Sequence, residues 1–299
     1  MLAIAGLMCS SAHAVFDLMQ IEQVIGGVDG DTTKQAIQLR MRSSFQNFVS
    51  AARMRVFDAQ GRNPVTVIDF ASDMAFSACG RRVLITSANF GLDPSITSDF
   101  TMASLIPASY LAAGSLTFEN NSGTAVFWRL SWGGASYTGP TDGSCINDDS
   151  LCPSPGDFGV WPNALPSTSQ QALRFQGACS ALSTLNENDY AVTAGPSVWT
   201  NNATQSGTVP VPCPEDVNGD GTVNVLDLID LLLCFGLPDT PPCDTGQDVN
   251  GDGTVNVLDL IDLLLCFGLP DDPPCDTGQD VNGDGNINVL DLIDLLLEF

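Results

Sequence analysis

Polar and apolar residues alternate along several short segments between residues 15 and 199. Ile37, Leu39 and Met41 alternate with polar neighbours, and the segment RRVLITSA that follows Gly80 is mostly apolar. Alternation with a period of two places successive side chains on opposite faces of a strand. The segments therefore predict short β-strands, at a spacing that is typical of a β-sandwich.

The segment SLTFENNSGTAVFWRLSW predicts a β-hairpin that turns at Asn121-Ser122-Gly123. Aromatic residues are frequent in and after it. Two interpretations are open: an aromatic platform for sugar rings, or the core of the sandwich. Core packing is favoured because aromatic side chains dominate burial in small domains. The residues concerned are Trp128, Trp132, Tyr137 and Trp161.

A different pattern begins at Asp216. The sequence DVNGDGTVNVLDLIDLLLCFG at 216–236 returns unchanged at 248–268, and a near copy, DVNGDGNINVLDLIDLLLEF, ends at Phe299. In each copy, alternating Asp, Asn and Gly residues lead into a block of Leu and Ile. This block predicts a helix that is apolar on nearly every side, and such a helix must be buried against other helices or a partner.

Each repeat has the residues of a twelve-place calcium loop. Such a loop takes oxygen ligands at places one, three, five, seven, nine and twelve, with Gly at place six for the sharp turn. Calcium suits these ligands better than magnesium, which retains its water and prefers a smaller octahedral site. We expect about one calcium ion per repeat. The residues are Asp216, Asn218, Asp220, Thr222, Asn224 and Asp227; Asp248, Asn250, Asp252, Thr254, Asn256 and Asp259; and Asp280, Asn282, Asp284, Asn286, Asn288 and Asp291.

The segment PPCDTGQ before the second and third loops cannot form the first helix of an ordinary EF-hand. A repeated loop with a single following helix, and with Asp at place twelve, resembles the type I dockerin module over residues 216–299. The resemblance implies a calcium-dependent docking module that attaches a secreted protein to a cohesin-type receptor, often in polysaccharide-degrading assemblies. Val225 and Leu226 stand where dockerins tend to carry a hydroxyl pair, so another envelope protein is an open alternative as receptor.

Five tail cysteines resemble those of a cysteine-bearing dockerin variant at the C-termini of exported bacterial proteins. Their pairing stays open, because spacing does not determine connectivity. In one scheme, Cys234 pairs with Cys243 and Cys266 with Cys275; in the other, Cys213 pairs with Cys234 and Cys243 with Cys266. Both schemes leave one tail cysteine over. In the first part of the chain, CINDDSLC predicts a surface loop closed by Cys145 and Cys152, with Asp148 and Asp149 in solvent.

An odd number of repeats also predicts a docking surface. Paired calcium loops commonly join through the apolar residue at place eight, which is Val223, Val255 or Ile287. The two nearly identical repeats pair with each other, which leaves the third without a mate. We expect its helix to expose an apolar stripe that binds a partner or a second copy of the chain. This stripe consists of Leu290, Ile293, Leu296 and Leu297.

Charge is distributed very unevenly along the chain, whose formal net charge is −25. The residues from Val211 onward include 19 Asp and Glu but no Lys or Arg, whereas Met1–Pro210 contains 16 acidic and 10 basic residues. An acidic tail repels nucleic acid and anionic membranes and attracts cations. No segment is long and apolar enough to predict a membrane span.

The first residues, MLAIAGLMCSSAHA, predict a signal peptide, because an apolar run is followed by the small-x-small site Ala12-His13-Ala14. A buried first strand or helix is the alternative. Cleavage removes His13, the only histidine. Without it, Ser-His and Cys-His nucleophilic pairs and histidine-ligated zinc are excluded. Export also places the remaining cysteines where disulfides form.

The sequence therefore predicts a signal peptide at 1–14, a β-sandwich domain at 15–199, a linker at 200–212 and a dockerin-like module of three calcium loop-helix repeats at 213–299. The strand order of the sandwich also resembles a lamin-tail-type immunoglobulin-like domain. We expect an exported, non-catalytic protein anchored at the cell surface or in an extracellular assembly. The alternatives are a glycoside hydrolase that acts on polysaccharide through two carboxylates, or a self-associating structural surface protein.

Overall fold

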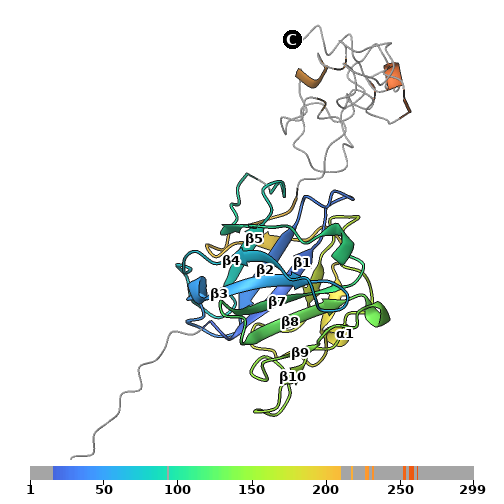
Figure 1. The fold of residues 1–299 in the computed structure, drawn as a ribbon. Coiled ribbons are helices and arrows are strands. Elements are labelled where there is room, and N and C mark those ends of the chain that lie inside the picture. The colour runs from blue at the N-terminus through green and yellow to red at the C-terminus, as the bar shows by residue number, and fades with distance from the viewer. Residues whose placement is uncertain are drawn as a thin grey trace, which may run out of the picture. The chain divides into compact units, whose positions relative to one another are not determined.

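The structure is a computed structural model that describes residues 16–92 and 94–209, together with residues 217, 226–228, 231, 252–253, 256–258 and 261. The predicted signal peptide lies outside the described residues. The chain divides into two units, Met1–Pro210 and Val211–Phe299. In the part that the structure describes, the first unit is mainly β (Figure 1), and no helix has the length and apolar character needed to cross a membrane.

The larger sheet of the first unit has the strand order β12-β11-β1-β2-β5-β6, in which only β5 and β6 are parallel. The predicted strands around Leu39 and after Gly80 are confirmed as β2 and β5. The strands are β1 (Met19–Ile25), β2 (Ala36–Met41), β5 (Arg82–Thr86), β6 (Phe100–Thr101), β11 (Leu173–Phe175) and β12 (Tyr190–Val192).

The smaller sheet has the antiparallel order β4-β3-β7-β8. The predicted hairpin is confirmed, since β7 pairs with β8 and the Gly123 amide donates to the Asn120 carbonyl at 2.9 Å. Gly123 has a φ of +71°, a conformation that glycine adopts at little cost. The strands are β3 (Ala52–Phe57), β4 (Val65–Asp69), β7 (Gly114–Asn120) and β8 (Val126–Trp132).

Short elements complete the first unit. Two pairs of short strands form separate two-stranded sheets. These strands are β9 (Asp142–Gly143), β10 (Gly156–Asp157), β13 (Trp199–Thr200) and β14 (Ser206–Gly207). The helical elements are α1 (Asn186–Asp189) and the 3-10 turns η1 (Val49–Ala51), η2 (Ala108–Tyr110) and η3 (Gly134–Ser136).

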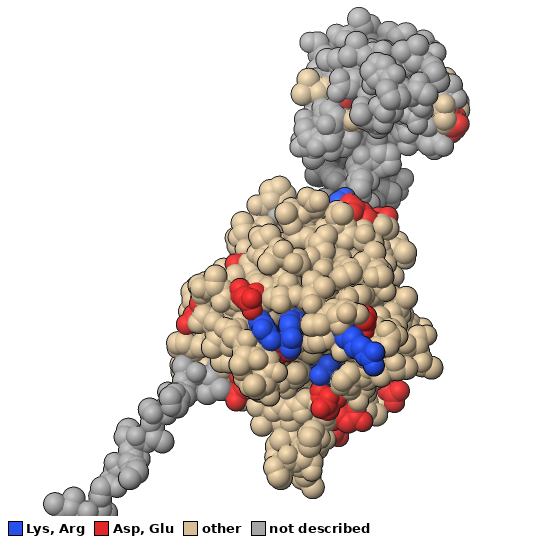
Figure 2. Space-filling view, viewed as in Figure 1, with Lys and Arg blue, Asp and Glu red and all other residues tan. Residues whose placement is uncertain are grey.

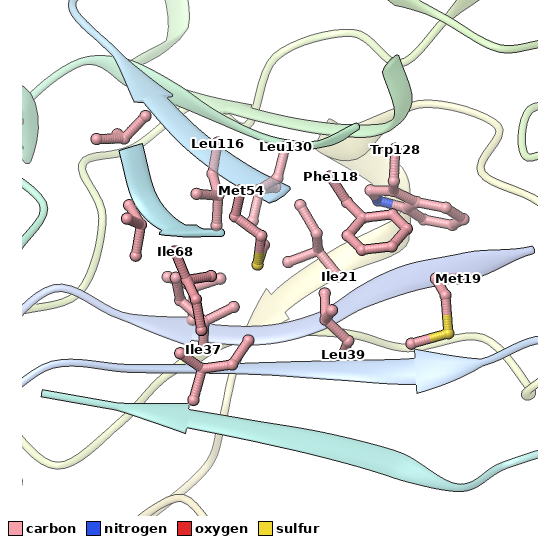
Figure 3. Close-up of a cluster of buried hydrophobic side chains, with 14 of the residues drawn as sticks. Met19, Ile21, Ile37, Leu39, Met54, Ile68, Leu116, Phe118, Trp128 and Leu130 are labelled. Carbon is pink, nitrogen blue, oxygen red and sulfur yellow. The ribbon is translucent and has the colours of Figure 1, made fainter. Parts of the chain in front are cut away.

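Apolar side chains from the two sheets form a common core (Figure 3). Ile21 and Leu39 from the larger sheet and Phe118 and Trp128 from the smaller sheet are all fully buried. Two buried aromatic polar groups of the core have partners: the Trp128 indole donates to the Tyr190 hydroxyl at 2.8 Å, and this hydroxyl donates to the Ile21 carbonyl at 2.6 Å. The first unit is therefore a two-layer β structure with one main core.

The predicted linker at 200–212 is wrong for residues 200–209, which belong to the folded unit. Asn202 is 3% exposed, and its side-chain amide donates to the carbonyls of Phe76 and Arg82 at 3.1 and 3.0 Å. Its backbone amide donates to Asp99 at 2.9 Å, and Val209 packs in a second apolar cluster. The composition is that of a linker, but the side-chain amides satisfy loop carbonyls that would otherwise lack partners.

Candidate functional site

Few of the predicted calcium ligands can be located. Asp227, Asp252 and Asn256 are described, and the others lie outside the described residues. Within the described part of the chain, no three His, Cys, Asp or Glu side chains are grouped as metal ligands. The calcium sites therefore stay predictions. The unlocated ligands are Asp216, Asn218, Asp220, Thr222, Asn224, Asp248, Asn250, Thr254, Asp259, Asp280, Asn282, Asp284, Asn286, Asn288 and Asp291.

The second repeat has local geometry that fits a calcium loop. Gly253, at place six, has a φ of +89°, in the left-handed region that the sharp turn of such a loop uses. Three residues later, the Asn256 side-chain oxygen accepts a hydrogen bond of 2.9 Å from the Leu258 amide. An Asn oxygen that accepts from the amide two residues on is an N-cap, and residues 257–258 are helical. The turn and the start of the helix thus lie at the places that the loop pattern predicts.

The first repeat buries a carboxylate at place twelve. Asp227 is fully buried, and its neighbours Leu228 and Leu231 are 1% and 0% exposed, whereas Leu226 is 51% exposed. Residues 226–228 are helical, so one face of this helix is buried and the other is exposed. The unit Val211–Phe299 contains no Lys, Arg or His. The side chains of this unit therefore carry no positive charge.

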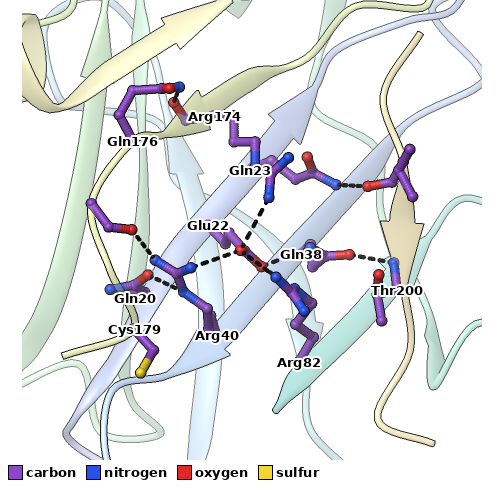
Figure 4. Close-up of polar contacts among 12 residues, drawn as sticks. Gln20, Glu22, Gln23, Gln38, Arg40, Arg82, Arg174, Gln176, Cys179 and Thr200 are labelled. Atoms are coloured by element: carbon purple, nitrogen blue, oxygen red, sulfur yellow. Dashed lines mark hydrogen bonds and ion pairs between the residues drawn. The ribbon is translucent and has the colours of Figure 1, made fainter. Parts of the chain in front are cut away.

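In the first unit, a buried carboxylate has basic side chains around it. Glu22 on β1 is fully buried beneath several arginines (Figure 4). Arg82 donates from Nε and Nη2 to its two oxygens at 2.6 and 3.0 Å, and Arg40 Nη1 lies 3.1 Å from Oε1. Arg174 lies farther away, at 3.8 Å, and Gln38 donates to Oε2 at 2.7 Å. The carboxylate is thus surrounded by charged and neutral donors.

This cluster lies on the outer face of the larger sheet, which the alternation in β2 predicts to be polar. The face is covered rather than open to solvent: Arg40 and Arg42 are 8% and 9% exposed. Their guanidinium groups donate to the carbonyls of Gly177 and Ser180 at 2.7 and 2.9 Å. Burial lowers the pKa of Arg40, and the positive charges of Arg82 and Arg174 lower it further, while Glu22 opposes the shift.

A second buried glutamate occupies the outer face of the smaller sheet. Glu119 on β7 accepts from Arg53 Nε at 2.6 Å and from both Nε and Nη2 of Arg55. Thr117 donates to its other oxygen at 3.2 Å. On the face that Figure 2 shows, the charged side chains of the first unit form small groups in a largely uncharged surface. Both ion clusters connect neighbouring strands, which is a structural role.

A cavity of about 460 Å³ lies beside the Glu22 cluster. Arg40, Arg174 and Gly177 are among the residues that line it. Arg174 is the most exposed arginine of the cluster, with a side-chain exposure of 39%. The cavity could admit a small polar molecule, but its described residues do not bring together a nucleophile and a general base.

The aromatic residues do not form a platform. Trp128 and Trp132 are fully buried and Tyr137 is 5% exposed, which confirms the core interpretation for these three. Trp161 is partly buried and packs against the main core. Sugar rings stack on exposed aromatic faces, so Trp128, Trp132 and Tyr137 are excluded as a binding surface for sugar.

The predicted disulfide between Cys145 and Cys152 is present, but the loop that it closes differs from the prediction. Asp148 is 1% exposed rather than solvated. It accepts hydrogen bonds from the Ser150 hydroxyl and from the Asp157 amide, the latter at 3.0 Å. Its position beside Ser183, which follows far along the chain, explains the burial. Because Asp148 and Ser183 are far apart in the sequence, no local pattern predicts this contact.

Sequence reasoning also missed two cysteines that the fold brings together. The sulfur atoms of Cys79 and Cys179 are 2.7 Å apart. The residues are separated by 100 positions, so no local pattern connects them. Only the presence of four cysteines between residues 16 and 209 could have raised the question.

No model of a known protein family matches the chain, and no curated protein sequence is significantly similar to it.

Proposed function

We propose that this protein is an exported, non-catalytic binding protein whose C-terminal repeats form a calcium-ordered docking module. The module carries the β domain at the cell surface or in an extracellular assembly. One observation carries the proposal: in the second repeat, Gly253 at place six has the left-handed conformation of a calcium-loop turn, and Asn256 at place nine accepts the N-cap hydrogen bond that starts the helix. A calcium ion bound by the loop supplies the positive charge that the unit's own side chains lack.

The threefold repetition supports calcium in particular. Places one, three, five, nine and twelve of every loop carry a side chain with an oxygen atom, and place seven contributes its backbone carbonyl. Gly253 and Asn256 have the conformation and the hydrogen bond that the turn and the helix start require. The residues present therefore fit the ion. Bound calcium compensates the loop carboxylates and orders the chain around them, so that its binding energy contributes to folding.

The finer identity of both units belongs to the same proposal. The repeats are a dockerin-like module, and the first unit is an immunoglobulin-like sandwich of the lamin-tail type. The partner is a cohesin-like receptor or another envelope protein. The docking face is the apolar stripe of the third repeat, from Leu290 to Leu297. The alternation of covered and exposed positions in the first repeat, with Leu228 buried and Leu226 exposed, is the pattern that a paired helix requires.

A calcium titration of the full chain tests the proposal. Far-ultraviolet circular dichroism should show a gain of helix on adding calcium, which magnesium at the same concentration does not reproduce. The triple variant Asp216→Ala, Asp248→Ala, Asp280→Ala removes place one from every loop and should lose this response. The control triple Asp239→Ala, Asp244→Ala, Asp276→Ala removes the same charge outside the loops and should keep it. A helical signal that persists in chelator, or equal loss in both triples, would contradict calcium-loop folding.

The docking face is tested on the same protein in calcium. Ile293→Ser with Leu297→Ser should abolish capture by the receptor while leaving the helix gain intact. Sedimentation of the purified chain distinguishes self-association from capture of a different protein. If the double variant still docks, and Leu228→Asp in the first repeat blocks docking, then the third repeat is not the docking face.

A further inference from the structure

Cys79 and Cys179 lie closer together than separate thiols pack. Their sulfur atoms are 2.7 Å apart, which is between a normal sulfur contact and the length of a disulfide bond, about 2.05 Å. Cys79 lies in the turn before β5, and Cys179 lies in the segment that follows β11. Only a small movement therefore separates the two sulfurs from bonding distance.

The surroundings hold both cysteines in position. The Cys79 amide donates to the Ser44 hydroxyl at 3.3 Å, and the next amide, of Gly80, donates to the Met41 carbonyl at 2.9 Å. On the other side, Arg40 and Arg42 donate to the carbonyls of Gly177 and Ser180, which flank Cys179. Figure 4 shows Cys179 beside Arg40. The two sulfurs are thus brought together by the fold.

We propose that Cys79 and Cys179 form a second disulfide bond of the first unit. The oxidant is a disulfide, either of a small thiol such as glutathione or of a thiol oxidoreductase. The thiolate of one cysteine attacks the oxidant, which releases one thiolate and leaves a mixed disulfide. The thiolate of the other cysteine then attacks the protein sulfur of this mixed disulfide, and the second half of the oxidant leaves as a thiolate. The two cysteines lose two electrons and two protons, and the oxidant is reduced to two thiols.

The local charges suit this exchange. Arg40 and Arg42 are close enough to stabilise a thiolate, although the hydrogen bond with Cys179 raises the pKa of the Cys79 thiol. Cys79 is exposed, so an oxidant can reach it. Since Cys145 is bonded to Cys152, the new bond uses the last two cysteines of the described first unit.

The bond has a structural consequence that the Cys145–Cys152 bond lacks. It attaches the segment that contains Gly177 and Ser180 to the turn before β5. This segment covers Arg40 and Arg42 and forms one wall of the cavity beside Glu22. The bond also closes a loop of 100 positions, whereas Cys145 and Cys152 are separated by 7. A longer loop loses more chain entropy on cross-linking, so this bond contributes more stability.

Peptide mapping tests the bond directly. The full chain is refolded in a glutathione redox buffer, its free thiols are blocked, and it is digested without reductant. Trypsin and a glutamate-specific endoproteinase release residues 63–81, which contain Cys79, and residues 175–187, which contain Cys179. The two peptides should appear as one species that reductant separates. Blocked thiols on both peptides, or a link from either one to a tail peptide, would overturn the proposal.

Thermal unfolding tests what the bond does. In a Cys145→Ser, Cys152→Ser background, reductant should lower the Tm of the first unit by on the order of 10 °C. Adding Cys79→Ser and Cys179→Ser should give the same low Tm with or without reductant. Under the same redox conditions, the calcium-induced gain of helix should be equal in all variants, so failure here is distinct from failure of the docking proposal. A reductant effect that persists without Cys79 and Cys179 would contradict this role.

Discussion

The two units of the chain differ in the basic side chains available to their buried carboxylates. In the first unit, Glu22 and Glu119 are fully buried, and each contacts two or more arginines. In the second unit, Asp227 is equally buried, yet the unit has 19 acidic residues and no basic one. The comparison teaches that the first unit carries its own counter-charges, whereas the second has no basic side chain to supply them, and we propose calcium from solution in that role. Stability of the two units should therefore respond to different conditions.

The largest expected effect is the removal of calcium. In chelator the repeats should lose their helical signal entirely, because the loop carboxylates repel one another. The first unit should keep its thermal transition, since its core and ion clusters do not involve the repeats. Scanning calorimetry of the full chain with and without calcium measures both. A single transition that moves as a whole would contradict the independence of the units.

The second largest effect is expected from a cavity created in the core of the first unit. Trp128→Ala removes a fully buried side chain and leaves the Tyr190 hydroxyl without its indole donor. The first unit should lose about 3–5 kcal/mol of unfolding free energy. Denaturant unfolding followed by near-ultraviolet circular dichroism measures this loss. The calcium midpoint of the repeats serves as the control, and it should not change.

Two leucines of the first repeat, one buried and one exposed, provide a matched pair of substitutions that tests the packing of the repeats. Leu228 is 1% exposed and Leu226 is 51% exposed on the same helical segment. Leu228→Ala should destabilise the calcium-loaded repeats by about 2–5 kcal/mol, because it leaves a cavity. Leu226→Ala should cost much less, because its side chain is already half in solvent. The Tm of the calcium-dependent transition reports both, and equal losses would show that the repeat does not bury the predicted face.

The smallest expected effect comes from pH, and it should have opposite signs in the two units. Burial raises the pKa of Asp17 and Asp99 above the usual 3.8. Such a carboxyl stabilises the fold fully below pH 3.8, and that contribution is lost as the pH rises through its folded pKa. Acidification from pH 7 toward 4 should therefore favour the first unit through these groups. The same protons compete with calcium for the loop carboxylates and destabilise the repeats.

Two further aspartates with shifted pKa values do not change this expectation between pH 4 and 7. A hydrogen bond from Thr33 lowers the pKa of Asp31, and one from the Arg62 amide lowers that of Asp58. Their contributions are present above pH 3.8 and are lost only as the pH falls through the lowered values. In calorimetry, lowering the pH from 7 to 4 should thus raise the Tm of the first unit and lower the Tm of the repeats. Asp99→Asn should reduce the slope for the first unit, and an unchanged slope would exclude Asp99 as its cause.

Local patterns predicted the parts of the fold that local physics determines. Alternation identified β2, a mostly apolar run identified β5, and the Asn-Ser-Gly turn identified the β7–β8 hairpin. The bond between Cys145 and Cys152 followed from close spacing in a loop. In the repeats, the described conformation of Gly253 and the hydrogen bond of Asn256 lie where the loop pattern places them, while calcium binding itself stays a prediction.

The remainder depends on contacts between distant residues. Arg40 and Arg42 alternate with apolar neighbours like solvent-facing residues, but a segment far along the chain covers them. Asn202 has the composition of a linker, and only the folded positions of Asp99 and Phe76 supply its partners. Periodicity states which face a residue occupies. It does not state whether another segment covers that face.

The pairing of β1 also constrains the order of events during synthesis. This first strand lies between β2, which follows it closely, and β11, where Gln23 is opposite Arg174. Strand pairs of such sequence separation form slowly, because a long loop must close first. The larger sheet therefore cannot be completed until nearly the whole first unit has been synthesised. Until then one edge of β1 lacks its partner strand, so the growing chain exposes unpaired backbone donors and acceptors to any other strand that it meets.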